Sequence, residues 1–255
     1  MTTEKTRMLS AVAALLLAGS GCAPNSTSGG SAEETATETY PWHTDIVATT
    51  FWVGEIHDPD APDGSQVRSA YDSFWLESYG GCDGKVIAGS CETEKRTEKD
   101  RWLPRNMTPL ENPFYLDLPF DDVNDPRAFA IRPYVVPWAD EPGYAGREKD
   151  KSFSYMKNRW VRITKDDHEC YGQIQDAGPG VYDDEGYVFG DDDARPANTD
   201  YNGAGLDVSP ALNGCLGFEA LNGANDRVSW QFVDDEDVPD GPWLDIVTTR
   251  QVQHG

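Results

Sequence analysis

Short runs of alternating apolar and polar residues are the feature that most restricts what this chain can fold into. The clearest run is "RVSWQFV", residues 227–233, in which Val228, Trp230 and Phe232 fall on one face. Alternation with a period of two is typical of a strand with one buried face. Five further runs have a strand-like composition: 47–56, 114–120, 159–164, 170–175 and 244–249. Because clusters of Gly, Pro, Asn and Asp separate the runs, we predict a mostly-β fold with long loops.

The N-terminal residues have the pattern of an export signal. The apolar run "MLSAVAALLLA", residues 8–18, follows two basic residues and is too short to cross a bilayer. Small residues directly before Cys22 resemble a bacterial lipobox, in which the cysteine is lipidated and becomes the mature N-terminus. We therefore predict a lipoprotein signal peptide over residues 1–21 and membrane attachment only through a lipid on Cys22. An ordinary secreted protein is the alternative.

Composition changes sharply after the predicted signal. Residues 22–40 are small, polar and acidic, so they are expected to form a flexible tether. All eight tryptophans and all nine phenylalanines lie beyond residue 40, and we predict one folded domain over residues 41–255. Within it, about 57–110 reads as an inserted loop region. One helix start stands out, with Ser209 as N-cap and Pro210 at the first helical position.

The cysteines fit an oxidising compartment. With Cys22 set aside for the lipid, four remain, and an even number in an exported chain indicates two disulfides. Of the three pairings that four cysteines allow, we favour Cys82–Cys91 as a local clasp and Cys170–Cys215 as a long-range tie. A zinc site is the alternative, but no C-x-x-C pair or histidine cluster accompanies these cysteines.

The chain is strongly acidic. It carries 45 Asp and Glu against 21 Lys and Arg, for a net charge of −24. Such a surface repels nucleic acid and anionic lipid headgroups, so no nucleic-acid partner is expected. The charge suits a neutral or cationic ligand, or it serves solubility alone.

Several stretches occur in the order of a known pattern. They are "FYLDLPF", then "NRWVRIT" and "CYGQIQDAGPG", then "GAGLDVSPALNGCLGF", and finally "RVSWQFV". Over about residues 113–235 they resemble the rare lipoprotein A family, whose double-psi β-barrel is shared with expansins, small-barrel endoglucanases and some lytic transglycosylases. The resemblance implies a double-psi-like six-stranded β-barrel with long loops and a short helix.

The resemblance also implies a set of functional residues. In that family the aspartate of "D-x-G-P" is the acid/base that cleaves the glycan strand of peptidoglycan, and here it is Asp176. The family's catalytic histidine has no counterpart, because Tyr115 stands at the corresponding place. Asp207 coincides with the acid of the small-barrel endoglucanases. Asp117 or Glu55 would be a partner carboxylate, since glycoside cleavage usually needs two.

We therefore predict Asp176 and Asp207 as catalytic residues, and Tyr115, Asp117 and Trp52 as substrate-binding residues. A carboxylate at a strand end, near apolar walls, can have its pKa raised toward the operating pH. Simpler explanations stay open for both catalytic candidates. Asp207 would only cap the short helix, and Asp176 would only hold backbone amides of its own Gly-rich turn. Tryptophans could stack on sugar rings, although buried tryptophan in a β core is the commoner case.

No metal or other cofactor is expected. The stretches "HDPDAPDGSQ" and "GDDDARPANTD" are rich in aspartate and faintly resemble calcium loops. Neither has the EF-hand spacing or its terminal glutamate, so calcium remains an alternative only.

The sequence thus predicts an exported, lipid-anchored protein of the cell envelope that acts on polysaccharide, foremost peptidoglycan. Hydrolysis and lytic transglycosylation are both open. One rival is a non-catalytic, expansin-like carbohydrate-binding module, and the other is a structural envelope protein with no glycan ligand. The missing histidine favours the binding module, whereas Asp176 followed by Gly-Pro favours the enzyme.

Overall fold

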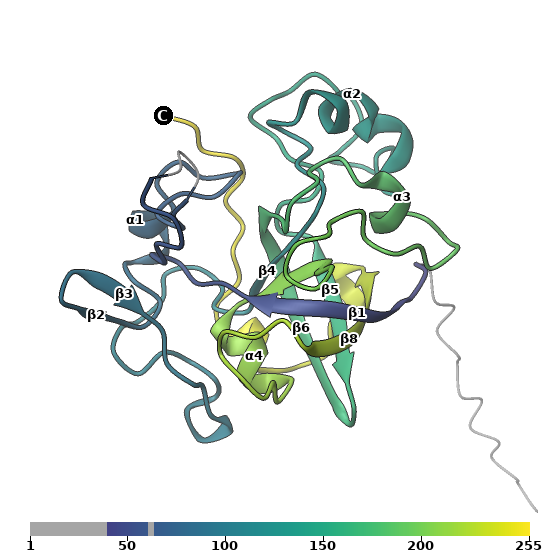
Figure 1. Cartoon of the computed structure of the whole chain (residues 1–255). Helices are drawn as coiled ribbons and strands as arrows, with labels where there is room; N and C mark the ends of the chain where they lie inside the picture. The colour runs from purple at the N-terminus through teal and green to yellow at the C-terminus, as the bar shows by residue number, and fades with distance from the viewer. Residues whose placement is uncertain (1–39, 61–63) are drawn as a thin grey trace, which may run out of the picture. The chain divides into compact units, whose positions relative to one another are not determined.

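A closed barrel of six strands forms the centre of the protein (Figure 1). The computed structural model describes residues 40–60 and 64–255. Strands follow each other around the barrel in the order β1-β7-β4-β6-β5-β8, and β8 pairs with β1 to close it. The strands are β1 His43–Thr50, β4 Tyr115–Leu118, β5 Trp160–Lys165, β6 His168–Ala177, β7 Leu206–Val208 and β8 Asp226–Val233. Pairs β1·β7 and β4·β6 are parallel and the other four antiparallel. The predicted mostly-β, six-stranded barrel is confirmed.

The remaining elements lie in the long connections between the barrel strands and, for the last two, in the segment that follows β8. These are α1 Trp75–Tyr79, β2 Lys85–Ile87, β3 Ser90–Glu92, η1 Glu98–Asp100, α2 Pro126–Val135, α3 Glu185–Val188, α4 Pro210–Cys215, η2 Asp235–Asp237 and η3 Pro242–Leu244. Among the described residues, no helix combines the length and apolar character needed to cross a membrane. The predicted signal peptide, the predicted lipidation site Cys22 and nearly all of the predicted tether lie outside the described residues.

Five of the six barrel strands fall at predicted runs, and one prediction is wrong. Residues 244–249 contain no strand. There the chain is held by hydrogen bonds that involve side chains, and not by backbone pairing with another strand. Thr248 Oγ1 accepts a hydrogen bond from Asn112 N, and Thr248 N donates one to Gln173 Oε1, both at 2.9 Å. The strand that takes its place in the barrel is β7, which at three residues is too short to show an alternating pattern.

The predicted helix start is confirmed. Ser209 Oγ accepts a hydrogen bond from Leu212 N at 3.2 Å, and α4 begins at the next residue. Cys215 at the end of α4 forms a disulfide with Cys170 in β6. The close packing of α4 on β6 requires Gly172, because a Cβ there would lie 2.8 Å from Leu212 Cδ1.

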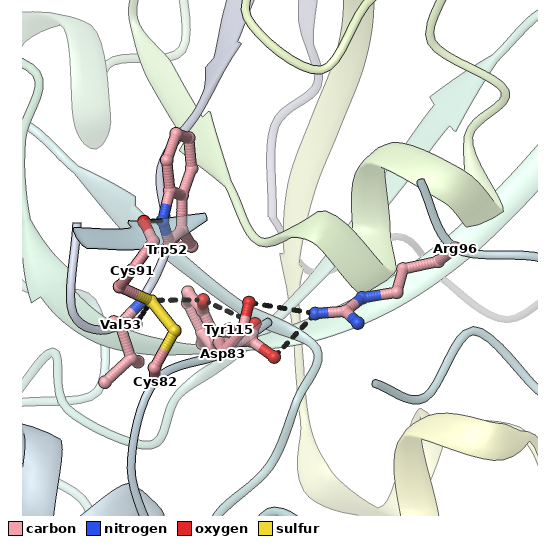
Figure 2. The surroundings of a disulfide bond; sticks show 7 residues. All are labelled: Trp52, Val53, Cys82, Asp83, Cys91, Arg96 and Tyr115. Atoms are coloured by element: carbon pink, nitrogen blue, oxygen red, sulfur yellow. Dashed lines mark hydrogen bonds and ion pairs between the residues drawn. A yellow bond between two sulfur atoms is a disulfide. The ribbon is translucent and has the colours of Figure 1, made fainter. Parts of the chain in front are cut away.

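A buried polar network fastens the inserted region to the barrel beside the second predicted disulfide, Cys82–Cys91 (Figure 2). Asp83 lies between two donors: Tyr115 Oη at 2.8 Å and Arg96 Nη2 at 2.7 Å. Tyr115 Oη in turn accepts a hydrogen bond from Val53 N at 3.0 Å. Since Asp83, Tyr115 and Arg96 are all buried, each one needs the others to satisfy its polar atoms.

We expect the two disulfides to contribute unequally to stability. Cys170–Cys215 spans 45 residues of sequence and Cys82–Cys91 spans nine. In the chain-entropy account these loops correspond to about 4 and about 2.6 kcal/mol. Replacing both cysteines of a pair by alanine should therefore lower the free energy of unfolding by about 1.4 kcal/mol more for Cys170–Cys215, as measured by urea denaturation. If removing Cys82–Cys91 lowered the free energy of unfolding more, the contribution of each disulfide would depend on local packing and not on loop length.

Candidate functional site

Three aspartates from distant parts of the chain meet on adjacent strands. Asp117 on β4 pairs in register with Asp207 on β7 and with Asp176 on β6. Thr49 on β1 is the register partner of Asp207 on its other side. Because register partners on neighbouring strands are close enough for their side chains to interact, the barrel builds a row of four polar residues across four strands. We call Thr49, Asp207, Asp117 and Asp176 the carboxylate row. It contains both predicted catalytic residues.

Hydrogen bonds and close contacts hold the carboxylate row together. Thr49 Oγ1 donates to Asp207 Oδ1, and Asp207 N donates to Asp117 Oδ1 at 3.2 Å. The other oxygen of Asp117 faces Gly178, where a Cβ would lie only 2.8 Å away. The first glycine of the "GPG" turn is therefore needed because the Asp117 carboxyl group packs directly against its backbone.

Asp176 lies near the end of β6, and its two oxygens have different surroundings. Oδ1 accepts hydrogen bonds from Ala177 N at 2.8 Å and from Ala70 N at 2.7 Å. Oδ2 accepts no hydrogen bond from any residue in the described part of the chain. Asp176 thus holds its own turn, as the simpler explanation expected. It also fastens the segment around Ala70, and it keeps one oxygen for another partner.

A pocket of about 250 Å³ opens beside this carboxyl group. It is lined by Asp176 and Ala177 at the end of β6 and by residues from the segment 65–70 of the inserted region. Asp121 and Tyr182 complete the lining. The side chain of Tyr182 is 43% exposed and brings aromatic surface to the pocket. The pocket therefore combines an acid, an aromatic ring and several polar groups from the inserted region.

Burial changes the acidity of the carboxylate row. It raises the pKa of Asp176 to about 7, although the backbone hydrogen bonds to this carboxyl group act in the opposite direction. Burial, helped by the charges of Asp176 and Glu55, also raises the pKa of Asp207 to about 7. Burial and the charges of its two aspartate neighbours raise the pKa of Asp117 well above its ordinary value. Near neutral pH the row therefore holds protons that it can exchange, as a general acid or base must.

The two predicted catalytic residues have different access to the pocket. Asp176 is part of its wall, whereas Asp207 is not among the residues that line it. Asp207 is connected to Asp176 through Asp117, which lies on the strand between them. Glu55, the other predicted partner, is partly buried, and burial raises its pKa to about 7. Asp176 is thus the carboxyl group best placed to meet a ligand.

All three predicted substrate-binding residues are buried, and Asp117, in the carboxylate row, is 3% exposed. Tyr115 is 0% exposed and binds Asp83 through its hydroxyl. Trp52 is 5% exposed and donates a hydrogen bond from Nε1 to Cys91 O at 2.9 Å (Figure 2). Tyr115 and Trp52 both pack near the Cys82–Cys91 disulfide, and their contact with a substrate stays a prediction. The other tryptophans considered for sugar stacking are buried too: Trp75, Trp138, Trp160 and Trp243.

The described residues give no support to the calcium alternative. Within 40–60 and 64–255, no group of three or more His, Cys, Asp or Glu side chains is arranged to hold a metal ion. The first of the two calcium-like stretches includes residues 61–63, which lie outside the described part.

No known protein family, curated protein or solved structure matches this chain. Its function must therefore be argued from the chemistry of the site. A buried carboxyl group that titrates near neutral pH can give a proton to a bound molecule and take one back. Hydroxyl and amide groups beside an aromatic ring are the groups that usually orient a small polar ligand in a pocket.

Proposed function

We propose that the protein acts on polysaccharide, foremost cell-wall glycan, with Asp176 as the acid/base. The observation that carries the proposal is the setting of Asp176. It is 6% exposed at a strand end, burial raises its pKa to about 7, and it lines an open pocket. Among the described residues, only its Oδ1 accepts hydrogen bonds. A carboxyl group with a pKa near the operating pH is the most effective general acid for cleaving a glycosidic bond.

Two further observations support the proposal. The mixed, closed six-stranded barrel is compatible with the double-psi barrel of the rare lipoprotein A family, and Asp176 stands at that family's acid/base position. The pocket also offers what a sugar ring needs, since Tyr182 supplies an aromatic surface and Ser65, Gln66 and Ser69 supply polar groups.

In the proposed reaction, Asp176 gives its proton to the glycosidic oxygen while the bond from that oxygen to the anomeric carbon breaks. The resulting cation is then attacked in one of two ways. If water attacks, a second carboxylate must take its proton, and Asp207 is the candidate. If a hydroxyl of the same sugar attacks, Asp176, now a carboxylate, takes the proton of that hydroxyl, and an anhydro sugar results.

The cellular setting is proposed together with the activity. We infer an exported protein that is lipid-anchored to the cell envelope through Cys22. The two disulfides support export, because disulfides form and persist in oxidising compartments.

The activity is tested by incubating the protein with purified peptidoglycan and with a panel of β-glucans. Asp176→Asn should release at least about 100-fold less oligosaccharide than the native protein, since a general acid contributes a factor of about 10² to 10⁴. Mass spectrometry of the product ends separates the two routes: anhydro ends mean a lyase and reducing ends a hydrolase. With reducing ends, Asp207→Asn should also be inactive. Equal release by Asp176→Asn and native protein would rule out the proposed role.

A non-catalytic carbohydrate-binding module is the second candidate. The observation that favours it is that Asp176 Oδ1 already has a structural use, in binding Ala70 N and Ala177 N. In that case neither protein would release products, and both would sediment with the same polymer.

A further inference from the structure

Arg68 brings a positive charge to the pocket that contains Asp176. It belongs to the segment of residues 65–70, and its side chain is exposed in the pocket lining. The same segment is fixed to the barrel end by the hydrogen bond from Ala70 N to Asp176 Oδ1. A ligand that reaches Asp176 would therefore pass within reach of the Arg68 guanidinium group.

Arg68 differs from the other arginines of the described chain in having no carboxylate partner. Each of the other eleven forms an ion pair with an aspartate or glutamate: Arg96, Arg101, Arg105, Arg127, Arg132, Arg147, Arg159, Arg162, Arg195, Arg227 and Arg250. In a protein with 45 acidic residues, a carboxylate partner is available on most of the surface. In the pocket, the guanidinium group of Arg68 therefore has no carboxylate partner among the described residues and is available to a ligand.

The acidic residues of the pocket are occupied in other ways. Asp121 accepts hydrogen bonds from the backbone nitrogens of Val123 and Asn124 at 3.1 and 2.9 Å, and from the Asn124 side chain. Asp176 binds two backbone nitrogens through Oδ1, and its raised pKa leaves it partly protonated near neutral pH. Neither carboxyl group therefore competes strongly with a ligand for Arg68.

We propose that Arg68 binds the carboxylate of an acidic sugar, so that the pocket selects carboxylate-bearing glycans. This inference rests on the proposed action on polysaccharide and names the substrate class of the same site. The planar guanidinium group matches a carboxylate in shape and can form two parallel, charge-assisted hydrogen bonds with it. In this arrangement Arg68 fixes one ring of the glycan while Asp176 acts on the neighbouring bond.

The net charge of the protein makes the inference easy to test. A chain of net charge −24 repels an acidic polymer at long range. Without a dedicated cationic subsite, the protein should bind an acidic glycan more weakly than the same glycan with its carboxylates reduced to alcohols. With the subsite, the order is reversed.

The experiment compares each polymer before and after carboxyl reduction. The probes are peptidoglycan strands freed of their stem peptides, so that the sugar carboxylates are uncovered, and polygalacturonate, both coupled to beads. Binding is measured by sedimentation with Asp176→Asn as the parent protein, so that the polymers stay intact. The parent should bind the native form of at least one of them about 10-fold more tightly than its reduced form. Adding Arg68→Gln should remove this preference, whereas Arg68→Lys should keep part of it. Arg101→Gln is the matched control, because Arg101 is exposed and paired with Asp245.

Two results would overturn the inference while leaving the proposed function intact. One is equal binding of native and reduced polymers by the parent, and the other is an unchanged preference after Arg68→Gln. A parent that binds neither form of these polymers, and no neutral β-glucan either, would contradict the proposed function itself, and the inference would be lost with it.

Discussion

At pH 8, the Asp176→Asn variant is expected to be more stable than the native protein by about 4 kcal/mol, although it should no longer cleave glycan. The carboxyl group has an ordinary pKa of 3.8, and burial raises it to about 7 in the folded protein. This difference corresponds to about 4 kcal/mol, at about 1.4 kcal/mol per pKa unit. Asparagine has no charge to bury, and its amide oxygen can still accept the hydrogen bonds from Ala70 N and Ala177 N.

The direction of this stability difference depends on whether the folded or the unfolded state binds the proton of Asp176. Between pH 3.8 and about 7 the folded protein keeps the Asp176 proton and the unfolded chain has lost it. The contribution of Asp176 to the free energy of unfolding is therefore fully present below pH 3.8 and is lost as the pH rises through 7. The native protein and Asp176→Asn should have similar free energies of unfolding at pH 4 and should differ most at pH 8.

Urea denaturation at a series of pH values measures the difference, with Asp192→Asn as a control on an exposed aspartate. The control should follow the native protein at every pH. If Asp176→Asn were equal to or less stable than the native protein at pH 8, the carboxylate would be held in its charged form, and it could not serve as a general acid near neutral pH.

The sequence predicts the three aspartates of the carboxylate row, but it predicts neither Thr49 nor the order in which the four residues lie. Asp176 stands out because a strand-like run ends there in a Gly-Pro-Gly turn, and Asp207 because the family resemblance places it at the acid of the small-barrel endoglucanases. That Asp117 lies between them depends on the strand order β7-β4-β6, which brings together residues up to 90 positions apart. Strand order is a property of the whole barrel, and local patterns of alternation do not encode it.

The contribution of residues 65–70 to the pocket could not be predicted from the sequence. Residues 65–70 belong to an inserted region with no repeating pattern, and a single hydrogen bond from Ala70 N joins them to Asp176. Tyr182, by contrast, lies only six residues after Asp176 in the sequence. Its position just beyond the Gly-Pro-Gly turn is therefore a signal that its ring lies close to Asp176. The burial of Tyr115 and Trp52 could not be predicted either, because an aromatic residue at a strand end suits a groove and a core equally well.

Arg127 and Arg132, both in α2 ("PRAFAIRPYV"), also show that the sequence does not reveal which side chains are buried. They lie five residues apart with similar neighbours in sequence, yet Arg127 is exposed and Arg132 is 0% exposed. Arg127 pairs with Asp183 and Glu185 at the surface. Arg132 pairs with the fully buried Asp122. The two arginines therefore form a matched pair for testing what a buried charge contributes to this fold.

The guanidinium group of Arg132 joins separate parts of the segment between β4 and β5. Its Nη1 donates to the backbone oxygens of Asp122 and Phe153, each at 2.9 Å. Its Nη2 donates to the backbone oxygens of Arg147 and Asp150 at 2.7 and 2.8 Å. Removing the side chain would leave four carbonyl groups without this donor. It would also leave the fully buried Asp122 carboxylate without its cationic partner, and the loss of a partner for a buried charge is costly.

Arg132→Met should therefore lower the free energy of unfolding by about 3 to 5 kcal/mol, the usual result of leaving a buried charge unpaired. Arg127→Met should cost less than about 1 kcal/mol, because surface ion pairs contribute little. Both values come from urea denaturation of the two variants beside the native protein. Because Asp122 directly follows the pocket residue Asp121, Arg132→Met should also weaken polymer binding at the pocket, which Arg127→Met should leave unchanged. Equal destabilisation by the two variants would mean that apolar packing around Trp138 and Tyr155, and not the buried ion pair, holds this segment in place.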